Sequence, residues 1–231
     1  MSDLSPADWQ AVFLSFKVAG IALLFALPLA LIVAYVLARW SFRGKVFLDG
    51  LVHLPLVLPP VVTGYVLLLL FGRAGILGRF FEHTFGLVFA FRWTGAALAA
   101  GIMAFPLMVR PMRIAIEGVD RKLEEAASTL GARQVVTLAV VTLPLALPGI
   151  IAAALLGFAK AMGEFGATIT FVSNIPGETR TLALDLYTLT QTPDGDGAAF
   201  SLIIIAVVIA FGAVIASEII TRRLAKRIGG N

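Results

Sequence analysis

The sequence contains no cysteine, only two histidines and few charged residues, since Asp, Glu, Lys and Arg make up 14% of its 231 residues. The lack of cysteine excludes disulfide bonds, thiolate metal sites and a thiol nucleophile. The histidines, His53 and His83, form no H-E-x-x-H pattern, and no G-x-S-x-G pattern occurs. The single Gly-Lys pair, Gly44-Lys45, is followed by valine, so it lacks the Ser or Thr of a phosphate-binding loop. Neither hydrolase chemistry nor ATP hydrolysis is indicated on this chain.

Apolar residues, in contrast, are abundant: 59% of the residues are hydrophobic and the mean hydropathy is +0.96. These values are far from those of soluble domains and predict an all-α integral membrane protein. Because each span takes about 20 residues, we expect one transmembrane domain over 1–231 and no separate soluble domain. The net charge of +4 does not indicate nucleic-acid binding, since the basic residues cluster beside apolar segments.

Five apolar runs are long enough to be spans. They cover approximately 11–38, 51–71, 95–109, 143–161 and 202–217. The third run extends backwards over 85–91 if the Arg92 side chain reaches the membrane surface. A further segment, 178–190, fits either a short sixth span or a helix at the membrane surface, and its Asp185 favours the surface.

Basic residues beside these spans predict their orientation, because Lys and Arg anchor span ends on the cytoplasmic side. With the N-terminus outside and five spans, most of the 18 basic residues and the C-terminus lie inside. The cytoplasmic clusters are Arg39, Arg43 and Lys45; Arg110, Arg113, Arg121, Lys122 and Arg133; and Arg222, Arg223, Lys226 and Arg227.

A short charged helix is predicted between the third and fourth spans, on the cytoplasmic side. Asp120 is placed to cap its start and Gly131 to stop it. Its apolar positions recur at helical spacing: Leu123, Ala126, Ala127 and Leu130. Such a thin stripe buries too little surface to fold alone, so the helix requires a partner, which is either the lipid headgroups or another protein.

The second alternative is supported by a resemblance. Glu125-Ala126-Ala127, followed by Gly131, Val141 and Leu143-Pro144, resembles the EAA loop of ABC importer permeases, with valine in place of the family's isoleucine. The resemblance implies that 117–144 is a coupling loop that docks into a cleft of a cytoplasmic ATPase subunit. The implied coupling residues are Glu125, Ala126, Ala127, Gly131, Leu143 and Pro144.

The resemblance extends over nearly the whole chain and is strongest to permeases of molybdate importers. It is carried by "HLPLVLPPVVTGY", "FPLMVR", "LPLALPGI" and above all "GEFGATITFVSNIPGETRTL". It implies the transmembrane domain of a type I ABC importer in the bacterial inner membrane. It also implies a permease homodimer, two ATP-binding subunits that hold ATP and magnesium, and an extracytoplasmic molybdate-binding protein. No cofactor is expected on this chain itself.

Several alternatives stay open. The "GEFGA" core is similar to sulfate permeases too, and tungstate is nearly the same size as molybdate. An ion-coupled secondary anion transporter would place Asp, Glu or His within its spans, and Glu164 is the one candidate. Neither that transporter nor a passive anion channel explains the cytoplasmic helix.

The translocation path is expected near the outer end of the fourth span. Lys160 and Glu164 are spaced to form an ion pair, which either stabilises the fold or lines the path. Glycines with accessible N–H groups, neutral hydroxyls and helix-breaking prolines complete the candidate set. The candidates are Lys160, Gly163, Glu164, Gly166, Thr168, Thr170, Ser173, Pro59 and Pro60.

Overall fold

The computed structural model describes residues 4–193 and 195–228, and this part of the chain is helical without strands. The helices are α1 (Pro6–Arg39), α2 (Lys45–Val57), α3 (Pro60–Phe71), α4 (Ile76–Phe85), α5 (Trp93–Glu117), α6 (Arg121–Thr129), α7 (Gln134–Thr137), the π-helical turn η1 (Leu138–Thr142), α8 (Leu143–Met162), α9 (Gly166–Val172), α10 (Leu182–Thr190) and α11 (Asp196–Ile228). The predicted all-α class is confirmed.

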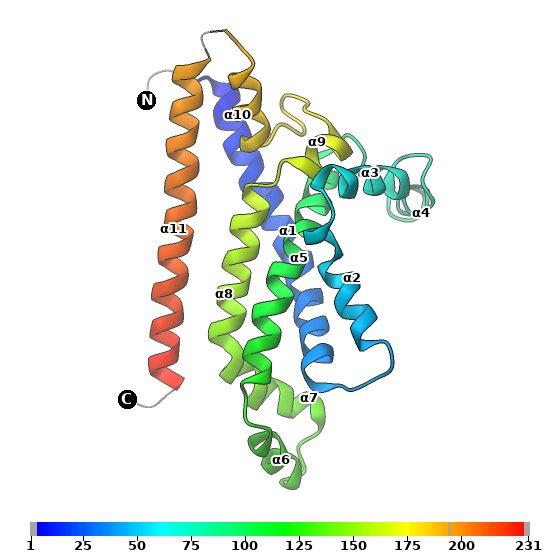
Figure 1. Ribbon diagram of the computed structural model, residues 1–231, viewed down its shortest axis with the longest axis vertical. Helices are drawn as coiled ribbons and strands as arrows, with labels where there is room; N and C mark the ends of the chain where they lie inside the picture. Colours follow the sequence, from blue (N-terminus) through cyan, green and yellow to red (C-terminus); the bar gives the residue numbers. More distant parts are fainter. Residues whose placement is uncertain (1–3, 194, 229–231) are drawn as a thin grey trace.

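Four helical stretches in the described part are long and apolar enough to cross a membrane. They are α1, α5, the stretch Gln134–Met162 and α11 over Asp196–Ile220. In Figure 1 these stretches run side by side along the long axis of the molecule. Counting the bent pair α2 and α3 as one span gives five, as predicted.

The second predicted span is not one straight helix, which corrects the expectation for 51–71. α2 ends at Val57 and α3 begins at Pro60, with a bend of 112° between them. Proline at the first position of α3 lacks an N–H that the helix would leave free there anyway, so it starts a helix well but does not continue one. In Figure 1, α2 runs along the bundle, where it contacts α5, whereas α3 turns sideways and leads outward to α4.

The third span begins at Trp93, so the backward extension over 85–91 was wrong. α4 ends at Phe85, and Gly86 follows in the left-handed conformation with a φ of 66°. The Thr94 hydroxyl donates a hydrogen bond to the Val88 carbonyl at 2.6 Å, which fixes the turn into α5. The span instead continues in the other direction, to Glu117.

The segment 178–190 does not form a sixth span. Its helix, α10, has nine residues and is therefore about 14 Å long, against a hydrocarbon core of about 30 Å. α10 lies beside the start of α1 and the start of α11 (Figure 1). The short helix instead fits the alternative that Asp185 favoured, a helix at the membrane surface, and Asp185 itself points inward and is 2% exposed.

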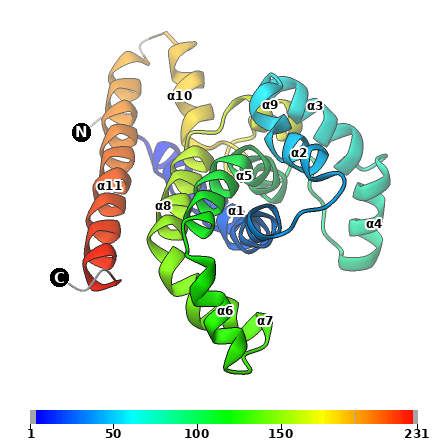
Figure 2. The ribbon, with the colours of Figure 1, turned by 60° about the horizontal axis from the view of Figure 1, so that its bottom comes forward.

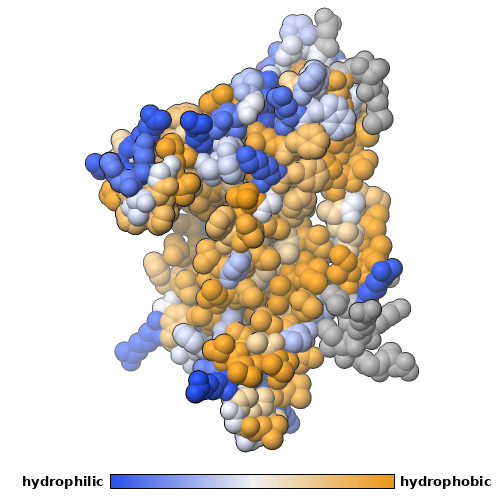
Figure 3. All heavy atoms as spheres, turned by 180° about the vertical axis from the view of Figure 1, so that it is seen from behind, coloured by the Kyte–Doolittle hydropathy of each residue, from blue (hydrophilic) through white to orange (hydrophobic). Residues whose placement is uncertain are grey.

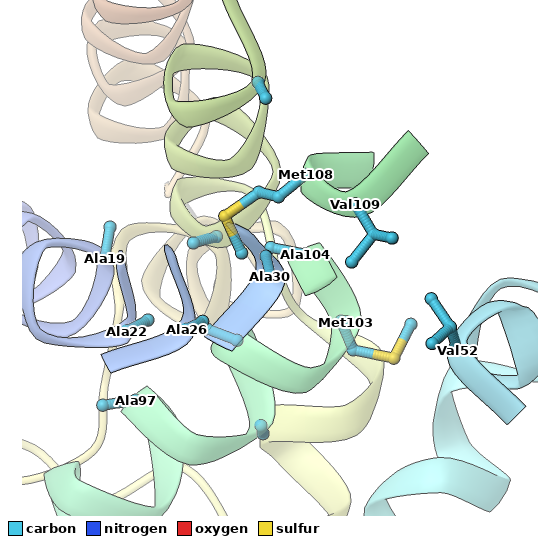
Figure 4. Close-up of a cluster of buried hydrophobic side chains, with 14 of the residues drawn as sticks. Ala19, Ala22, Ala26, Ala30, Val52, Ala97, Met103, Ala104, Met108 and Val109 are labelled. Atoms are coloured by element: carbon cyan, nitrogen blue, oxygen red, sulfur yellow. The ribbon is translucent and has the colours of Figure 1, made fainter. Parts of the chain in front are cut away.

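Small residues hold the central helices together. α5 lies between α1 and α8 (Figure 2), and its alanines face the alanines of α1. Figure 4 shows this contact, with Met103 pointing towards Val52 of α2 and Met108 towards α8. On α8, Gly149 lies so close to α5 that an added Cβ would be 2.3 Å from the Ala115 methyl carbon. Close backbone approach through Gly and Ala is the usual way in which helices associate in membranes.

Large apolar side chains cover much of the outside. Phe25, Leu29 and Phe211 are each more than half exposed. In Figure 3 hydrophobic residues form a broad band below a hydrophilic upper edge. This distribution fits a chain whose spans face lipid or other membrane helices.

Candidate coupling and translocation sites

The predicted cytoplasmic helix is α6, and its caps are as expected. The Asp120 carboxylate accepts a hydrogen bond from the Lys122 N–H at 2.9 Å, which satisfies one free donor of the first turn. Gly131 follows the helix with a φ of +87°, a conformation that costs glycine little. The predicted start and stop are therefore confirmed.

The apolar stripe of α6 is left largely uncovered by the described part of the chain. None of the nine residues of α6 is buried, and Leu130, just after it, is 89% exposed. Leu123 and Ala126 are exposed, as is Glu125 at the start of the EAA motif. Figure 2 shows α6 and α7 projecting from one end of the bundle. α6 thus presents its apolar stripe and Glu125 to whatever covers this end.

Glu124, the residue before the EAA motif, turns towards the spans instead. Its Oε1 accepts hydrogen bonds from an Arg39 guanidinium nitrogen at 2.9 Å and from the Thr142 hydroxyl at 2.6 Å. The same Arg39 nitrogen donates to the Val119 carbonyl at 3.1 Å. Sequence reasoning missed this contact, because Arg39 and Glu124 are 85 residues apart and the sequence marked them only as a span-end cation and a polar helix position.

The two halves of the EAA motif lie in different elements. Glu125, Ala126 and Ala127 are in α6, whereas Leu143 and Pro144 are the first two residues of α8. α7 and the π-helical turn η1 separate them. Single π-helical turns within helices are frequent at functional sites, and here the turn ends at Thr142, which contacts Glu124.

At the other end of α8, the predicted ion pair of Lys160 and Glu164 is formed. The Lys160 ammonium donates to one carboxylate oxygen of Glu164 at 2.6 Å. The second oxygen accepts the N–H of Ala167 at 3.0 Å, near the start of α9. The Glu164 side chain is only 2% exposed, whereas that of Lys160 is 30% exposed. Glu164 therefore joins the end of α8 to the start of α9 inside the fold.

The glycines and prolines of the candidate path lie where α3 and α9 cross. A Cβ on Gly166 would come within 2.7 Å of the Pro60 side chain, and one on Gly64 within 2.4 Å of the Ala167 carbonyl oxygen. Pro59 is the residue before α3 and is exposed. The structure thus brings Pro59, Pro60 and Gly166 together, and close packing is a direct reason for the glycines.

The three predicted hydroxyls have different environments. Thr168 is buried in the core, whereas Thr170 is partly buried and donates to the Gly166 carbonyl at 2.9 Å. Ser173 is exposed at the end of α9 with a φ of 64°, which is uncommon outside glycine. Gly163 is exposed at the end of α8. The candidates that reach the surface of the chain are therefore Lys160, Gly163, Gly166, Thr170, Ser173, Pro59 and Pro60.

A charged cluster lies between α1 and α10, at the end of the bundle opposite α6. Asp185 faces Arg180 at 3.7 Å and lies near Asp8, whose carboxylate caps the start of α1. The pKa of Asp185 is raised to about 6, first because burial disfavours the charged form and second because the Asp8 carboxyl is close, while Arg180 opposes both. Within residues 4–193 and 195–228, no three His, Asp or Glu side chains are grouped in a way that would hold a metal ion.

Comparison with known protein families identifies the family of this chain. The sequence model of the family described as "Binding-protein-dependent transport system inner membrane component" matches residues 26–226. The chain belongs to this family. As a binding-protein-dependent permease, it is the membrane component of a transport system, multi-pass in the inner membrane.

Alignments with individual relatives extend over almost the whole permease. It is 54% identical to the molybdenum transport system permease protein ModB of Escherichia coli (strain K12), over 98% of this chain and 99% of that one. It is 48% identical to ModB of Haemophilus influenzae, over 95% and 96% of the two chains. Among solved structures, a bacterial ABC transporter that imports the polysaccharide alginate superposes with a TM-score of 0.73 at 17% identity, covering 95% of this chain and 80% of that one. The permease therefore has the fold of an ABC importer transmembrane domain.

Proposed function

We propose that the chain is the permease subunit of an ATP-driven ABC importer that takes up molybdate. The observation that carries this proposal is the 54% identity, over almost the full length of both chains, to a permease named for molybdenum transport. The segment "GEFGATITFVSNIPGETRTL" supports it from the sequence. Tungstate and sulfate, which are also tetrahedral dianions, are the alternative substrates within the family.

We further propose the composition of the complex. Two copies of the permease associate with two cytoplasmic ATP-binding subunits, which hold ATP and magnesium, and with an extracytoplasmic molybdate-binding protein. The exposed apolar stripe of α6 supports a cytoplasmic protein partner, because a short helix with no buried residue needs a surface to cover Leu123 and the adjoining Leu130. The exposed apolar faces of the spans leave room for a second copy.

In the proposed mechanism, α6 docks into a cleft of the ATP-binding subunit. Closure of the ATP-binding subunits on ATP moves α6, and the spans connected to α6 then alternate between outward-open and inward-open arrangements. The N-terminus lies outside and the C-terminus in the cytoplasm. With this orientation α6 is on the side where ATP is available.

The proposed translocation path runs along the surface-reaching residues near the outer end of α8. The Ser173 hydroxyl is a neutral hydrogen-bond donor on this surface, and neutral donors suit transit because a strong cationic site would retain a dianion. The Thr170 hydroxyl and the Gly163 N–H lie on the same surface but already donate to the Gly166 and Ala159 carbonyls. Lys160 is the one cation among them, and its charge is balanced by Glu164. Glu164 and Thr168 support this wall from inside the fold, and the half-buried Gly166 packs against Pro60.

The decisive experiment is reconstitution. The chain is co-expressed with its ATP-binding subunit, purified, and placed in liposomes with the binding protein, and uptake of radiolabelled molybdate is measured with and without ATP. We expect a 2:2 assembly and ATP-dependent uptake, with tungstate and sulfate as competitors ranked by their inhibition. Uptake by the chain alone, driven by a proton or sodium gradient or by none, would instead identify a secondary transporter or a channel.

A further inference from the structure

Resting on the function just proposed, we infer that Glu124 is a positioning residue that makes the cytoplasmic helix α6 move together with α1 and α8. Three contacts carry this inference: Arg39 at the end of α1, the Val119 carbonyl in the turn from α5 to α6, and Thr142 at the start of α8. These three contacts meet at two side chains, those of Arg39 and Glu124. Glu124 therefore joins the helix that receives force to the helices that must move.

The contact among Arg39, Glu124 and Thr142 is rigid. The Arg39 and Glu124 side chains are 8% and 19% exposed, so solvent competes little for their hydrogen bonds. Hydrogen bonds between a guanidinium and a carboxylate are short and directional, and the Thr142 hydroxyl fixes the same oxygen from a second side. Removing one partner of a pair this enclosed leaves the other charge without compensation, which makes the pair act as a unit.

Little else fixes the orientation of α6. None of its residues is buried, and short connections at 118–120 and 130–133 join it to its neighbours. Without Glu124, α6 keeps its helical caps at Asp120 and Gly131 but loses its side-chain link to α1 and to Thr142. A docked ATP-binding subunit would then turn α6 without moving the spans.

The two neighbouring glutamates, Glu124 and Glu125, therefore have different roles. Glu125 is exposed and faces outward, where the proposed ATP-binding subunit docks, whereas Glu124 faces inward. Loss of Glu125 is therefore expected to weaken docking. Loss of Glu124 is expected to leave docking and ATP hydrolysis in place and to uncouple them from transport.

The test uses the assembled complex in liposomes and measures molybdate uptake, ATP hydrolysis and the amount of assembled complex for each variant. For Glu124→Ala and for Arg39→Ala we expect molybdate taken up per ATP hydrolysed to fall at least tenfold, while hydrolysis and assembly stay within about twofold of wild type. The double variant should be no worse than either single one, because both remove the same contact. Glu124→Gln, whose amide oxygen still accepts hydrogen bonds, should recover a large part of the ratio.

Asp49→Ala is the matched control. Asp49 contacts Arg113 at 3.2 Å and joins α2 to α5 by a carboxylate–guanidinium pair that does not involve α6. In this control variant, the ratio of molybdate uptake to ATP hydrolysis should stay within about twofold of wild type. An unchanged ratio in Glu124→Ala, or a loss of uptake that merely follows a loss of assembled complex, would overturn the inference.

A second measurement does not depend on transport. Because the chain has no cysteine, Phe42→Cys after α1 and Ser128→Cys on α6 introduce the only two thiols for spin labels. Pulsed electron resonance should give a narrow distance distribution in the otherwise wild-type chain and a broad one in Glu124→Ala. Equal widths would contradict the positioning role. Absence of ATP-driven uptake by the wild-type complex would instead contradict the proposed function and leave this distance test standing.

Discussion

Glu164 uses its two carboxylate oxygens for two different partners, one a side chain and one a backbone. One oxygen pairs with the Lys160 ammonium and the other accepts the Ala167 N–H. The i,i+4 spacing predicted the first contact from sequence. It did not predict the second, because that bond depends on the break of the helix at Gly163, which a run of apolar residues does not reveal.

We expect Lys160→Met to lower the yield of folded protein, because Glu164 is then left buried without a counter-charge. Breaking a buried pair costs about 3–5 kcal/mol, and the partial exposure of Lys160 places this case at the lower end. The double variant Lys160→Met with Glu164→Gln should restore most of the loss. Thermal unfolding in detergent measures this, with Thr168→Val as the control for a lost hydroxyl, at about 1 kcal/mol.

The same variants test the translocation path. If Lys160 lines the path, transport per folded complex should fall far more in Lys160→Met than in Thr168→Val, because a passing dianion then meets an unbalanced carboxylate. Unchanged transport per folded complex in Lys160→Met would remove Lys160 from the path and leave it a purely structural role.

Asp185 makes the stability of the α1–α10 end of the bundle depend on pH. Its pKa lies at about 6 in the folded chain against 3.8 ordinarily, so the folded state keeps a proton that the unfolded state has already lost. The free energy of unfolding should therefore fall as pH rises from about 4 to about 6 and level off above, by at most about 3 kcal/mol.

Thermal unfolding between pH 4.5 and 7.5 measures this dependence. Asp185→Asn should weaken it and should be more stable than wild type at pH 7.5, since the amide carries no charge to bury. A melting temperature of the wild-type chain that rises over the same range would show that other groups dominate.

At the scale of elements, the contact between α3 and α9 shows what sequence patterns miss. The prolines at 59–60 predicted a helix break, and the structure has one there, with α3 starting at Pro60 after the bend. The sequence patterns also predicted α6 and its two caps correctly, because capping residues act on the neighbouring backbone. The crossing of α3 over α9 depends on long-range packing at Gly64 and Gly166, which local patterns do not contain.

We therefore expect Gly64→Ala to disturb this crossing, because its Cβ would be 2.4 Å from the Ala167 carbonyl oxygen and 2.9 Å from the Thr170 Cβ. Overpacking of this kind costs about 1–3 kcal/mol. Gly20→Ala on α1 is the control, since a Cβ there meets nothing within 4 Å and alanine favours the helix. Equal melting temperatures for the two variants would mean that α3 and α9 separate easily.

The docking role of α6 has its own test. Glu125→Lys reverses a charge on the exposed rim, and Gly131→Pro alters the exit of the helix, yet neither residue lies in a span. Both variants should insert normally in the membrane, bind the ATP-binding subunit weakly and lose ATP-driven uptake. Normal uptake and normal binding in both would remove α6 from the docking site.

At the scale of the whole molecule, the orientation of the chain is testable because it has no cysteine of its own. Thr192, after α10, and Ser128, on α6, are both exposed and lie at opposite ends of the bundle. A membrane-impermeant maleimide should label Thr192→Cys in intact spheroplasts and Ser128→Cys only after lysis. The reverse pattern would place α6 outside and contradict the proposed coupling to ATP.

The small size of α6 has a consequence for how the complex assembles. Nine residues span about 14 Å, so one such helix covers far less than the roughly 800 Å² that each partner contributes to a stable protein interface. A single permease should therefore hold a single ATP-binding subunit only briefly. In the proposed 2:2 assembly, two weak contacts act through one rigid body, and the second forms at a high effective concentration. Avidity, rather than the affinity of either helix, would then keep the ATP-binding subunits bound. Each individual contact would stay weak enough to shift during the transport cycle.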